Sequence, residues 1–186
     1  MNEEIIFSGF GGQGALFAGQ LLAYSALESG LHVTWIPSYG PEMRGGTAHC
    51  TVVVSDEPIG SPFVRHPHAV VALNLPSFKK YEPLIKSGGL MVYNESLVPL
   101  QPTRTDITYI AVPANDVAEQ LGNVRMANVV LLGAYLVATG YLTLETVETA
   151  LDLHLGQRQR KYLGANKQAL HQGAQFARQV RETVAA

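Results

Sequence analysis

The sequence predicts an α/β protein with a Rossmann-like, open and mostly parallel sheet, flanking helices and a helical C-terminal third. An apolar strand, a glycine-rich turn and a long helix follow one another near the N-terminus. Residues 69–73 form a continuous apolar run, typical of a strand buried on both faces of a parallel sheet. With 186 residues we expect one domain over 1–186, with an α/β core to about residue 113 and a mainly helical part over 114–186.

The first 36 residues predict a strand, a helix and a second strand, joined as a right-handed βαβ unit. The first strand is the apolar segment 5–7, and helix formers fill residues 14–29. The second strand covers residues 32–36. We expect it to stop at Pro37, because proline donates no hydrogen bond to a neighbouring strand.

Four further strands are expected before residue 113. In the first of them, residues 47–55, one face carries Cys50 and is predicted to be core, whereas the other carries His49 and is more polar. The remaining elements are strands over 69–73, 90–93 and 107–112, a helix over 76–86 and a surface excursion over 56–67.

Helices are predicted over 116–121, 126–139, 143–155 and about 165–184. Two helices, over 14–29 and 126–139, are apolar around most of their circumference, and such helices must be covered on more than one side. Residues 127–139 carry no charge, but they are too few for the ~20 that span a bilayer. We expect a subunit interface to cover these helices, with central packing inside the domain as the alternative.

The formal net charge is only -2, so composition indicates neither a nucleic-acid partner nor a charged membrane surface. Residues 154–186 nevertheless hold six Lys or Arg and one acid, which leaves seven basic and fourteen acidic residues in 1–153. This basic segment is either a solvated helix pair or a docking face for an acidic partner or a phosphate.

Cys50 is the only cysteine, and one thiol cannot form a disulfide, a four-cysteine zinc site or an iron–sulfur cluster within the chain. The sequence runs from Met1 directly into an apolar strand, with no signal-type segment. We expect a cytoplasmic protein.

The segment 9–14, Gly-Phe-Gly-Gly-Gln-Gly, matches G-x-G-x-x-G between a predicted strand and a predicted helix. Such a turn lets backbone N–H groups face a phosphate, so it predicts phosphate or nucleotide binding. The alternative is a tight turn that serves only close helix–strand packing. An NAD site also needs an acid at the end of the second strand, and none lies between His32 and Gly40. Arg44 could meet an extra phosphate, as in NADP or coenzyme A.

The carboxyl ends of the predicted strands place glycine, hydroxyl and amide groups on one rim, at Gly9, Ser38, Asn74 and Asn94. Such a rim binds ligands but offers few acids or bases. His49 and Cys50 point to opposite faces of a strand and cannot pair as base and nucleophile, so we expect a buried structural cysteine. We expect neither catalytic residues nor a metal site, with His66 and His68 as surface residues and Glu42 with Arg44 as a structural or functional pair.

Four segments of the sequence resemble the gamma subunit, or gamma domain, of the 2-oxoacid:ferredoxin oxidoreductases. The resemblance extends from residue 5 to about 170, and its most specific part is the string Pro-Ser-Tyr-Gly-Pro-Glu-Met-Arg-Gly-Gly-Thr over 37–47. It is most similar to the 2-oxoglutarate branch, followed by the 2-oxoisovalerate branch. The other segments are 9–14, Ile-Gly-Ser-Pro over 59–62 and Ala-Leu-Asn over 72–74.

The resemblance implies a complex that converts a 2-oxoacid and coenzyme A to an acyl-CoA and carbon dioxide, and passes two electrons to ferredoxin. Thiamine diphosphate and iron–sulfur clusters would lie on alpha, beta and possibly delta subunits. This chain would complete the assembly and help bind coenzyme A. In fused relatives a lysine follows the glycine turn, but residues 15–20 contain no lysine. We expect Arg44 to make the phosphate contact in its place. The expected cofactor-binding residues are Gly9, Gly11, Gly12, Gln13, Gly14, Ser38, Tyr39, Arg44, Gly45, Gly46 and Asn74.

A free-standing Rossmann-type NADP-dependent oxidoreductase is the competing hypothesis. The isolated chain could also form homo-oligomers through its apolar helices. A stable chain that turns over NADPH alone would favour the competing hypothesis, whereas co-purification with thiamine-diphosphate and ferredoxin-like subunits would favour the first.

Overall fold

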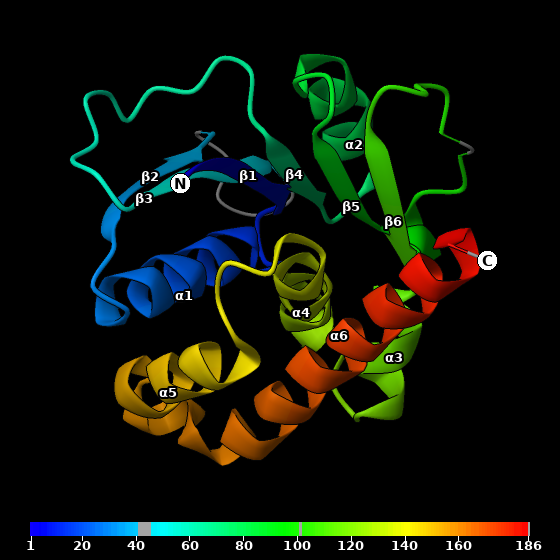
Figure 1. Ribbon diagram of the computed structural model, residues 1–186. Coiled ribbons are helices and arrows are strands. Elements are labelled where there is room, and N and C mark those ends of the chain that lie inside the picture. The colour runs from blue at the N-terminus through cyan, green and yellow to red at the C-terminus, as the bar shows by residue number, and fades with distance from the viewer. Residues whose placement is uncertain (41–45, 101, 186) are drawn as a thin grey trace.

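A six-stranded sheet forms the centre of the computed structural model, which describes residues 1–40, 46–100 and 102–185. The strand order is β2-β3-β1-β4-β5-β6, and helices flank both faces, which confirms the predicted α/β class (Figure 1). The strands are β1 (Asn2–Phe10), β2 (His32–Tyr39), β3 (Thr47–Ser55), β4 (Ala69–Ala72), β5 (Leu90–Asn94) and β6 (Thr108–Val112).

One strand departs from the predicted parallel arrangement. β3 lies between β1 and β2 and is antiparallel to both, whereas β1, β4, β5 and β6 are mutually parallel neighbours. The simple βαβ unit predicted for the first 36 residues is therefore wrong in its pairing, although β1 and β2 do run in the same direction. The alternating polarity of β3 agrees with this position, because antiparallel strands commonly have one less buried face.

β2 continues through Pro37 to Tyr39, so the prediction that Pro37 ends this strand is wrong. β2 is an edge strand that pairs only with β3, where Pro37 lies opposite Cys50. An edge position tolerates proline because its missing N–H can face away from the neighbouring strand.

The predicted helices are present with small shifts in their ends, except that the helix predicted over 76–86 ends at Tyr81. A 3₁₀ segment, η4 (Gln157–Tyr162), was not predicted and precedes the last helix. The α-helices are α1 (Ala15–Glu28), α2 (Leu75–Tyr81), α3 (Ala114–Gln120), α4 (Ala127–Thr139), α5 (Leu144–His154) and α6 (Leu163–Ala185). The other 3₁₀ segments are η1 (Glu82–Leu84), η2 (Glu95–Leu97) and η3 (Val124–Met126).

The helices divide unequally between the two faces of the sheet. α1 and α4 pack on one face, with α5 and α6 behind them, and α2 packs on the opposite face (Figure 1). Among the described residues, no helix is long and apolar enough to cross a membrane.

The chain itself covers α4. Every residue from Ala127 to Leu136 is buried, because this helix lies between the sheet and α6. The two helices approach closely at glycines, since a Cβ at Gly133 would lie 2.0 Å from the Leu170 carbonyl oxygen. The expectation of a subunit interface over this helix is therefore wrong, and central packing, the alternative, explains its apolar circumference. α1 is likewise covered by the sheet, α4 and α5.

Part of the basic C-terminal charge is paired within the chain. Lys167 lies 2.8 Å from the Asp152 carboxylate, and Arg160 donates to the Asp152 carbonyl oxygen at 3.5 Å. The solvated-face and docking-face interpretations of this segment both stay predictions.

Candidate functional site

The glycine turn joins the carboxyl end of β1 to the N-terminus of α1. Gly12 and Gly14 have φ of +99° and +81°, a region that side chains disfavour, so the turn needs glycine at these positions. Gly14 is the N-cap of α1 and supplies no side-chain cap, and the first helical hydrogen bond runs from Ala18 N–H to the Gly14 carbonyl oxygen at 3.0 Å. The N–H groups of Ala15, Leu16 and Phe17, in the first turn of α1, therefore lack intrahelical acceptors and can face an anion. In the preceding turn, Gln13 N–H donates to the Phe10 carbonyl oxygen at 3.0 Å and is not free for an anion.

A cavity of about 420 Å³ opens beside this turn. Its lining combines turn glycines with apolar and aromatic side chains, and none of the described residues that form it is charged. The first turn of α1 also contains no acid, so the positive end of the helix dipole is not offset there. We call this cavity the glycine-turn pocket; its lining residues are Phe10, Gly11, Gly12, Gly14, Ala15, Leu16, Phe17, Tyr39 and Ala48.

Gln13 and Asn74 meet at the junction of β1 and β4, where the chain connections diverge to opposite sides of the sheet. The Gln13 Oε1 accepts from Asn74 Nδ2 and from Phe10 N–H, both at 2.7 Å. Asn74 Oδ1 in turn accepts from Ser77 N–H at 2.9 Å and caps α2. This network occupies the crevice where ligands of open α/β sheets commonly bind, and it holds the glycine turn in shape. The cavity beside the turn is lined from β2 and β3, by Tyr39 and Ala48.

The other predicted binding residues belong to the turn itself, to β2 or to the segment before β3. Gly11 donates its N–H to the Gly46 carbonyl oxygen at 2.9 Å, so the turn is tied to the segment before β3. Tyr39 is 62% exposed and forms an outer wall of the glycine-turn pocket, whereas Ser38, also exposed, does not line it. Arg44 and Gly45 lie outside the described residues, as does Glu42.

Gly9 lies inside β1, where a Cβ would be 2.9 Å from Gln13 Oε1 and 3.1 Å from Leu73 Cβ. It therefore acts on the site by admitting the Gln13 side chain. Asn94, at the end of β5, is buried and donates to the Leu73 carbonyl oxygen at 3.3 Å, away from the glycine-turn pocket.

Asn128 is the site residue that sequence reasoning missed. Its Nδ2 donates to the Gly14 carbonyl oxygen at 2.9 Å, across 114 residues of sequence, and the side chain is buried. A Cβ on Gly14 would lie 2.3 Å from this Nδ2, so the amide occupies the space beside the turn. The available signal was a lone amide in the charge-free segment 127–139.

Cys50 is fully buried, which confirms its predicted structural role. Burial raises the pKa of its thiol to about 12, and its Sγ lies 3.6 Å from the Ala15 carbonyl oxygen. His49 points to the other face toward Tyr81, and burial, with Lys80 nearby, lowers its pKa. In the part of the chain that the structure describes, no three His, Cys, Asp or Glu side chains are arranged to hold a metal ion. His68 instead contacts Glu3 at 2.8 Å.

Comparisons with known proteins show which family the chain belongs to. The chain is 38% identical over 154 residues to 2-oxoglutarate synthase subunit KorC of Methanocaldococcus jannaschii, covering 81% of this chain and 82% of that protein. It is 37% identical over 178 residues to ketoisovalerate oxidoreductase subunit VorA of Methanothermobacter thermautotrophicus, covering 95% of this chain but only 36% of VorA. The chain thus spans about a third of the length of that relative.

Among solved structures, the keto/oxoacid ferredoxin oxidoreductase gamma subunit of Geobacter sulfurreducens superposes with a TM-score of 0.80 at 30% identity. The match covers 94% of this chain and 98% of that one. The 2-oxoglutarate:ferredoxin oxidoreductase of Magnetococcus marinus shares the fold, with a TM-score of 0.85 at 23% identity over 95% of this chain and 31% of that one. A model of the family described as pyruvate ferredoxin/flavodoxin oxidoreductase matches residues 4–176. The resemblance noted in the sequence is thereby confirmed, and the chain belongs to the pyruvate ferredoxin/flavodoxin oxidoreductase family.

Proposed function

We propose that this chain is the gamma subunit of a 2-oxoacid:ferredoxin oxidoreductase. The complex would convert 2-oxoglutarate, coenzyme A and oxidised ferredoxin to succinyl-CoA, carbon dioxide and reduced ferredoxin. This chain would complete the assembly and help bind coenzyme A, without a complete active site of its own. The similarity to KorC, a protein of comparable length, supports a separate subunit and the 2-oxoglutarate branch.

The observation that carries the coenzyme A role is the uncapped N-terminus of α1 beside the glycine-turn pocket. Backbone N–H groups would hold a phosphate of coenzyme A, since Gly12 and Gly14 place no side chain in the way. The apolar walls formed by Phe10, Leu16 and Tyr39 suit the less polar pantetheine arm. Arg44 remains our proposed cation for a phosphate. The Magnetococcus marinus enzyme, which shares the fold, was solved with coenzyme A and succinyl-CoA bound.

Under this proposal, thiamine diphosphate and the iron–sulfur clusters belong to alpha, beta and possibly delta subunits. Thiamine diphosphate would supply the adduct with the 2-oxoacid, and the clusters would carry electrons to ferredoxin. Cys50 is unsuited to hold a cluster, because its thiol is buried and its pKa is strongly raised. The proposal therefore gives this chain binding and assembly, and gives electron transfer to its partners.

Isolation of the chain from its native cells at natural abundance tests the proposal. We expect co-purification with subunits that contain thiamine diphosphate and iron–sulfur clusters, together with coenzyme A-dependent reduction of ferredoxin. The rate at limiting substrate should be greater with 2-oxoglutarate than with 2-oxoisovalerate or pyruvate. A chain that purifies alone and oxidises NADPH would contradict the proposal and favour a free-standing NADP-dependent oxidoreductase.

A further inference from the structure

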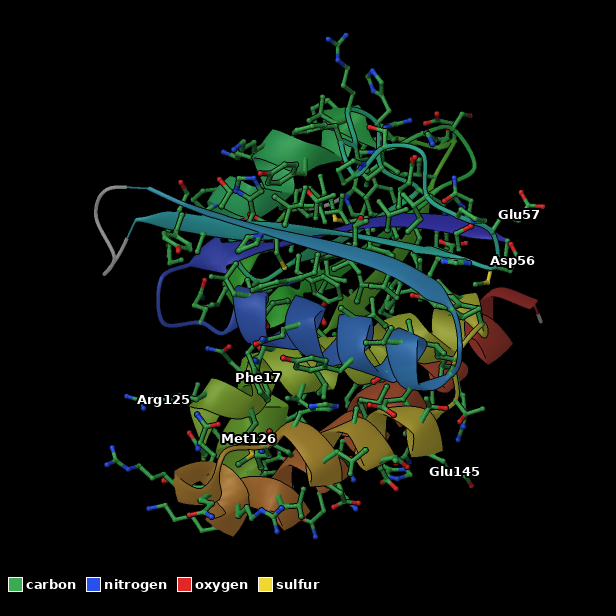
Figure 2. All side chains as sticks on the ribbon, turned by 90° about the vertical axis from the view of Figure 1, so that its left-hand side faces the viewer. Phe17, Asp56, Glu57, Arg125, Met126 and Glu145 are labelled. Carbon is green, nitrogen blue, oxygen red and sulfur yellow. The ribbon has the colours of Figure 1, made fainter. Side chains whose placement is uncertain are left out.

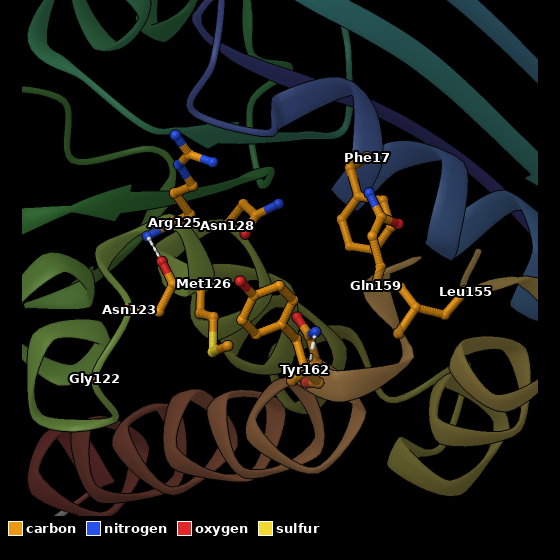
Figure 3. A pocket seen from close by; sticks show the side chains of 10 residues that line it. Phe17, Gly122, Asn123, Arg125, Met126, Asn128, Leu155, Gln159 and Tyr162 are labelled. Atoms are coloured by element: carbon orange, nitrogen blue, oxygen red, sulfur yellow. Dashed lines mark hydrogen bonds between the residues drawn. The ribbon is translucent and has the colours of Figure 1, made fainter. Parts of the chain in front are cut away.

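A second cavity, of about 400 Å³, lies on the other side of Phe17 from the glycine-turn pocket. It is formed between the start of α4, the segment η4 and the start of α6 (Figure 3). Figure 2 shows Phe17 of α1 on the same side of the molecule as Arg125 and Met126. We call this cavity the α4–η4 pocket; its lining residues are Phe17, Gly122, Asn123, Arg125, Met126, Asn128, Leu155, Gln159, Tyr162 and Asn166.

Buried amide side chains form the floor of the α4–η4 pocket. Asn128 and Asn166 are only 3% and 8% exposed, although both line the cavity. Asn166 Nδ2 donates to the Tyr162 carbonyl oxygen at 2.9 Å, and its Oδ1 has no partner among the described residues. Asn128 donates to the Gly14 carbonyl oxygen, so the floor of this pocket also supports the glycine turn. The two pockets are therefore adjacent parts of one surface.

Arg125 supplies the only charge among the lining residues. Its guanidinium is exposed and makes no ion pair within the described part of the chain. Its backbone N–H is held by Asn123 Oδ1 at 3.1 Å, which fixes the start of α4 around it. An unpaired guanidinium at a cavity without carboxylates favours an anionic ligand, and guanidinium geometry matches phosphate well.

The remaining walls fit a nucleoside. Phe17 and Tyr162 offer aromatic rings for stacking, and Gln159 with Asn166 offers amide groups that can pair with the edge of a purine. One cation, several amides and two rings form the usual set for a small polar ligand with an aromatic part.

We propose that the α4–η4 pocket is a nucleotide site that takes a purine nucleoside phosphate, with the phosphate on Arg125 and the base between the aromatic and amide walls. The identification of its occupant as the nucleotide end of coenzyme A rests on the proposed function. In that case coenzyme A lies across Phe17, with its nucleotide end in the α4–η4 pocket and the rest along the glycine turn. A free purine nucleotide has the same chemistry and is the other source.

Calorimetric titration of the full chain tests this site with three probes: adenosine 3′,5′-bisphosphate, coenzyme A and 4′-phosphopantetheine. The variant Arg125→Gln should weaken the first two about 10-fold, the effect of losing one hydrogen bond to a charged group, and leave phosphopantetheine unchanged. Arg158→Gln is the matched control, because it removes the same charge from an exposed position of η4 that does not line the pocket. It should leave all three affinities unchanged.

The outcomes separate this inference from the proposed function. If coenzyme A binds equally well to the wild type and Arg125→Gln, the nucleotide site is refuted while the coenzyme A role stands. If adenosine 3′,5′-bisphosphate binds with a dependence on Arg125 but coenzyme A does not bind, the nucleotide site stands and the coenzyme A role fails. If none of the nucleotide probes binds, the inference is overturned.

Discussion

Replacing Gly19 with alanine should separate α1 from the sheet and destabilise the fold. The new Cβ would lie 2.3 Å from Cys50 Sγ, against a normal contact of about 3.7 Å, and 3.2 and 3.3 Å from Phe7 and Val52. With three neighbours this close, we take the upper end of the overpacking cost, about 3 kcal/mol. The better helix propensity of alanine returns about 1 kcal/mol. The net loss of about 2 kcal/mol should lower Tm by about 4–8 °C.

Thermal unfolding followed by circular dichroism measures this effect. Gly164→Ala is the control, because an added Cβ there meets no atom within 4 Å, and its Tm should be unchanged or slightly higher. Cys50→Ala in the Gly19→Ala background removes the clashing sulfur, so the double variant should be more stable than the sum of the single effects by about 1–2 kcal/mol. Equal Tm values for Gly19→Ala and Gly164→Ala, or strict additivity with Cys50→Ala, would refute the packing argument.

Three further predictions concern side chains with defined surroundings. With a thiol pKa of about 12, roughly one Cys50 in ten thousand is ionised at pH 8. Iodoacetamide should therefore label the native chain far more slowly than the chain unfolded in urea. Equal labelling rates would contradict the burial of Cys50. Gln13→Ala should cost about 1–3 kcal/mol in urea unfolding, because it leaves Asn74 without its acceptor, whereas Gln13→Glu, which keeps an acceptor, should cost less. The Arg104 guanidinium lowers the pKa of Asp106 to about 2, so the pair's stabilisation is present above about pH 4 and is lost as the pH falls through 2. In the variant Arg104→Ala, NMR titration should find the pKa of Asp106 raised. An unchanged pKa would exclude the ion pair as the cause of the shift.

Local segments of the fold were predictable because their signals are local. The turn over 9–14 needs glycines for its backbone, and the apolar run that contains β4 identifies a buried strand wherever its partners lie. The insertion of β3 between β1 and β2 depends on pairing between segments far apart in sequence. The alternating polarity of β3 was compatible with an antiparallel strand, but periodicity does not name the neighbours of a strand.

The main error was the expectation that a subunit interface covers α4. A helix that is apolar all round shows only that something covers it. The cover is α6, a helix whose own sequence is polar on average, and the close approach depends on Gly133 and Gly173 facing the backbone of the partner helix. A pair of single glycines in two helices is too weak a sequence signal to predict this contact.

The candidate site was also predicted only in part. Gly12 and Gly14 were predicted from the glycine motif and Tyr39 from the family resemblance, and all three line one pocket. Gln13 and Asn74 form the network behind it. Asn128 and the α4–η4 pocket were not predicted, because they arise only when the start of α4 packs against the glycine turn.

The Michaelis constant for coenzyme A in the assembled complex tests the central claim that the glycine turn binds this cosubstrate. Gly12→Ala and Gly30→Ala both place a methyl group on a residue with positive φ, at +99° and +77°, where it meets no atom within 4 Å. Each should cost about 1–2 kcal/mol of backbone strain, but only Gly12 lines the glycine-turn pocket. We predict a rise in KM for coenzyme A of about 10-fold or more for Gly12→Ala alone, with the KM for the 2-oxoacid unchanged in both variants. An intact Gly12→Ala complex with the KM of the wild type and of Gly30→Ala would contradict the account.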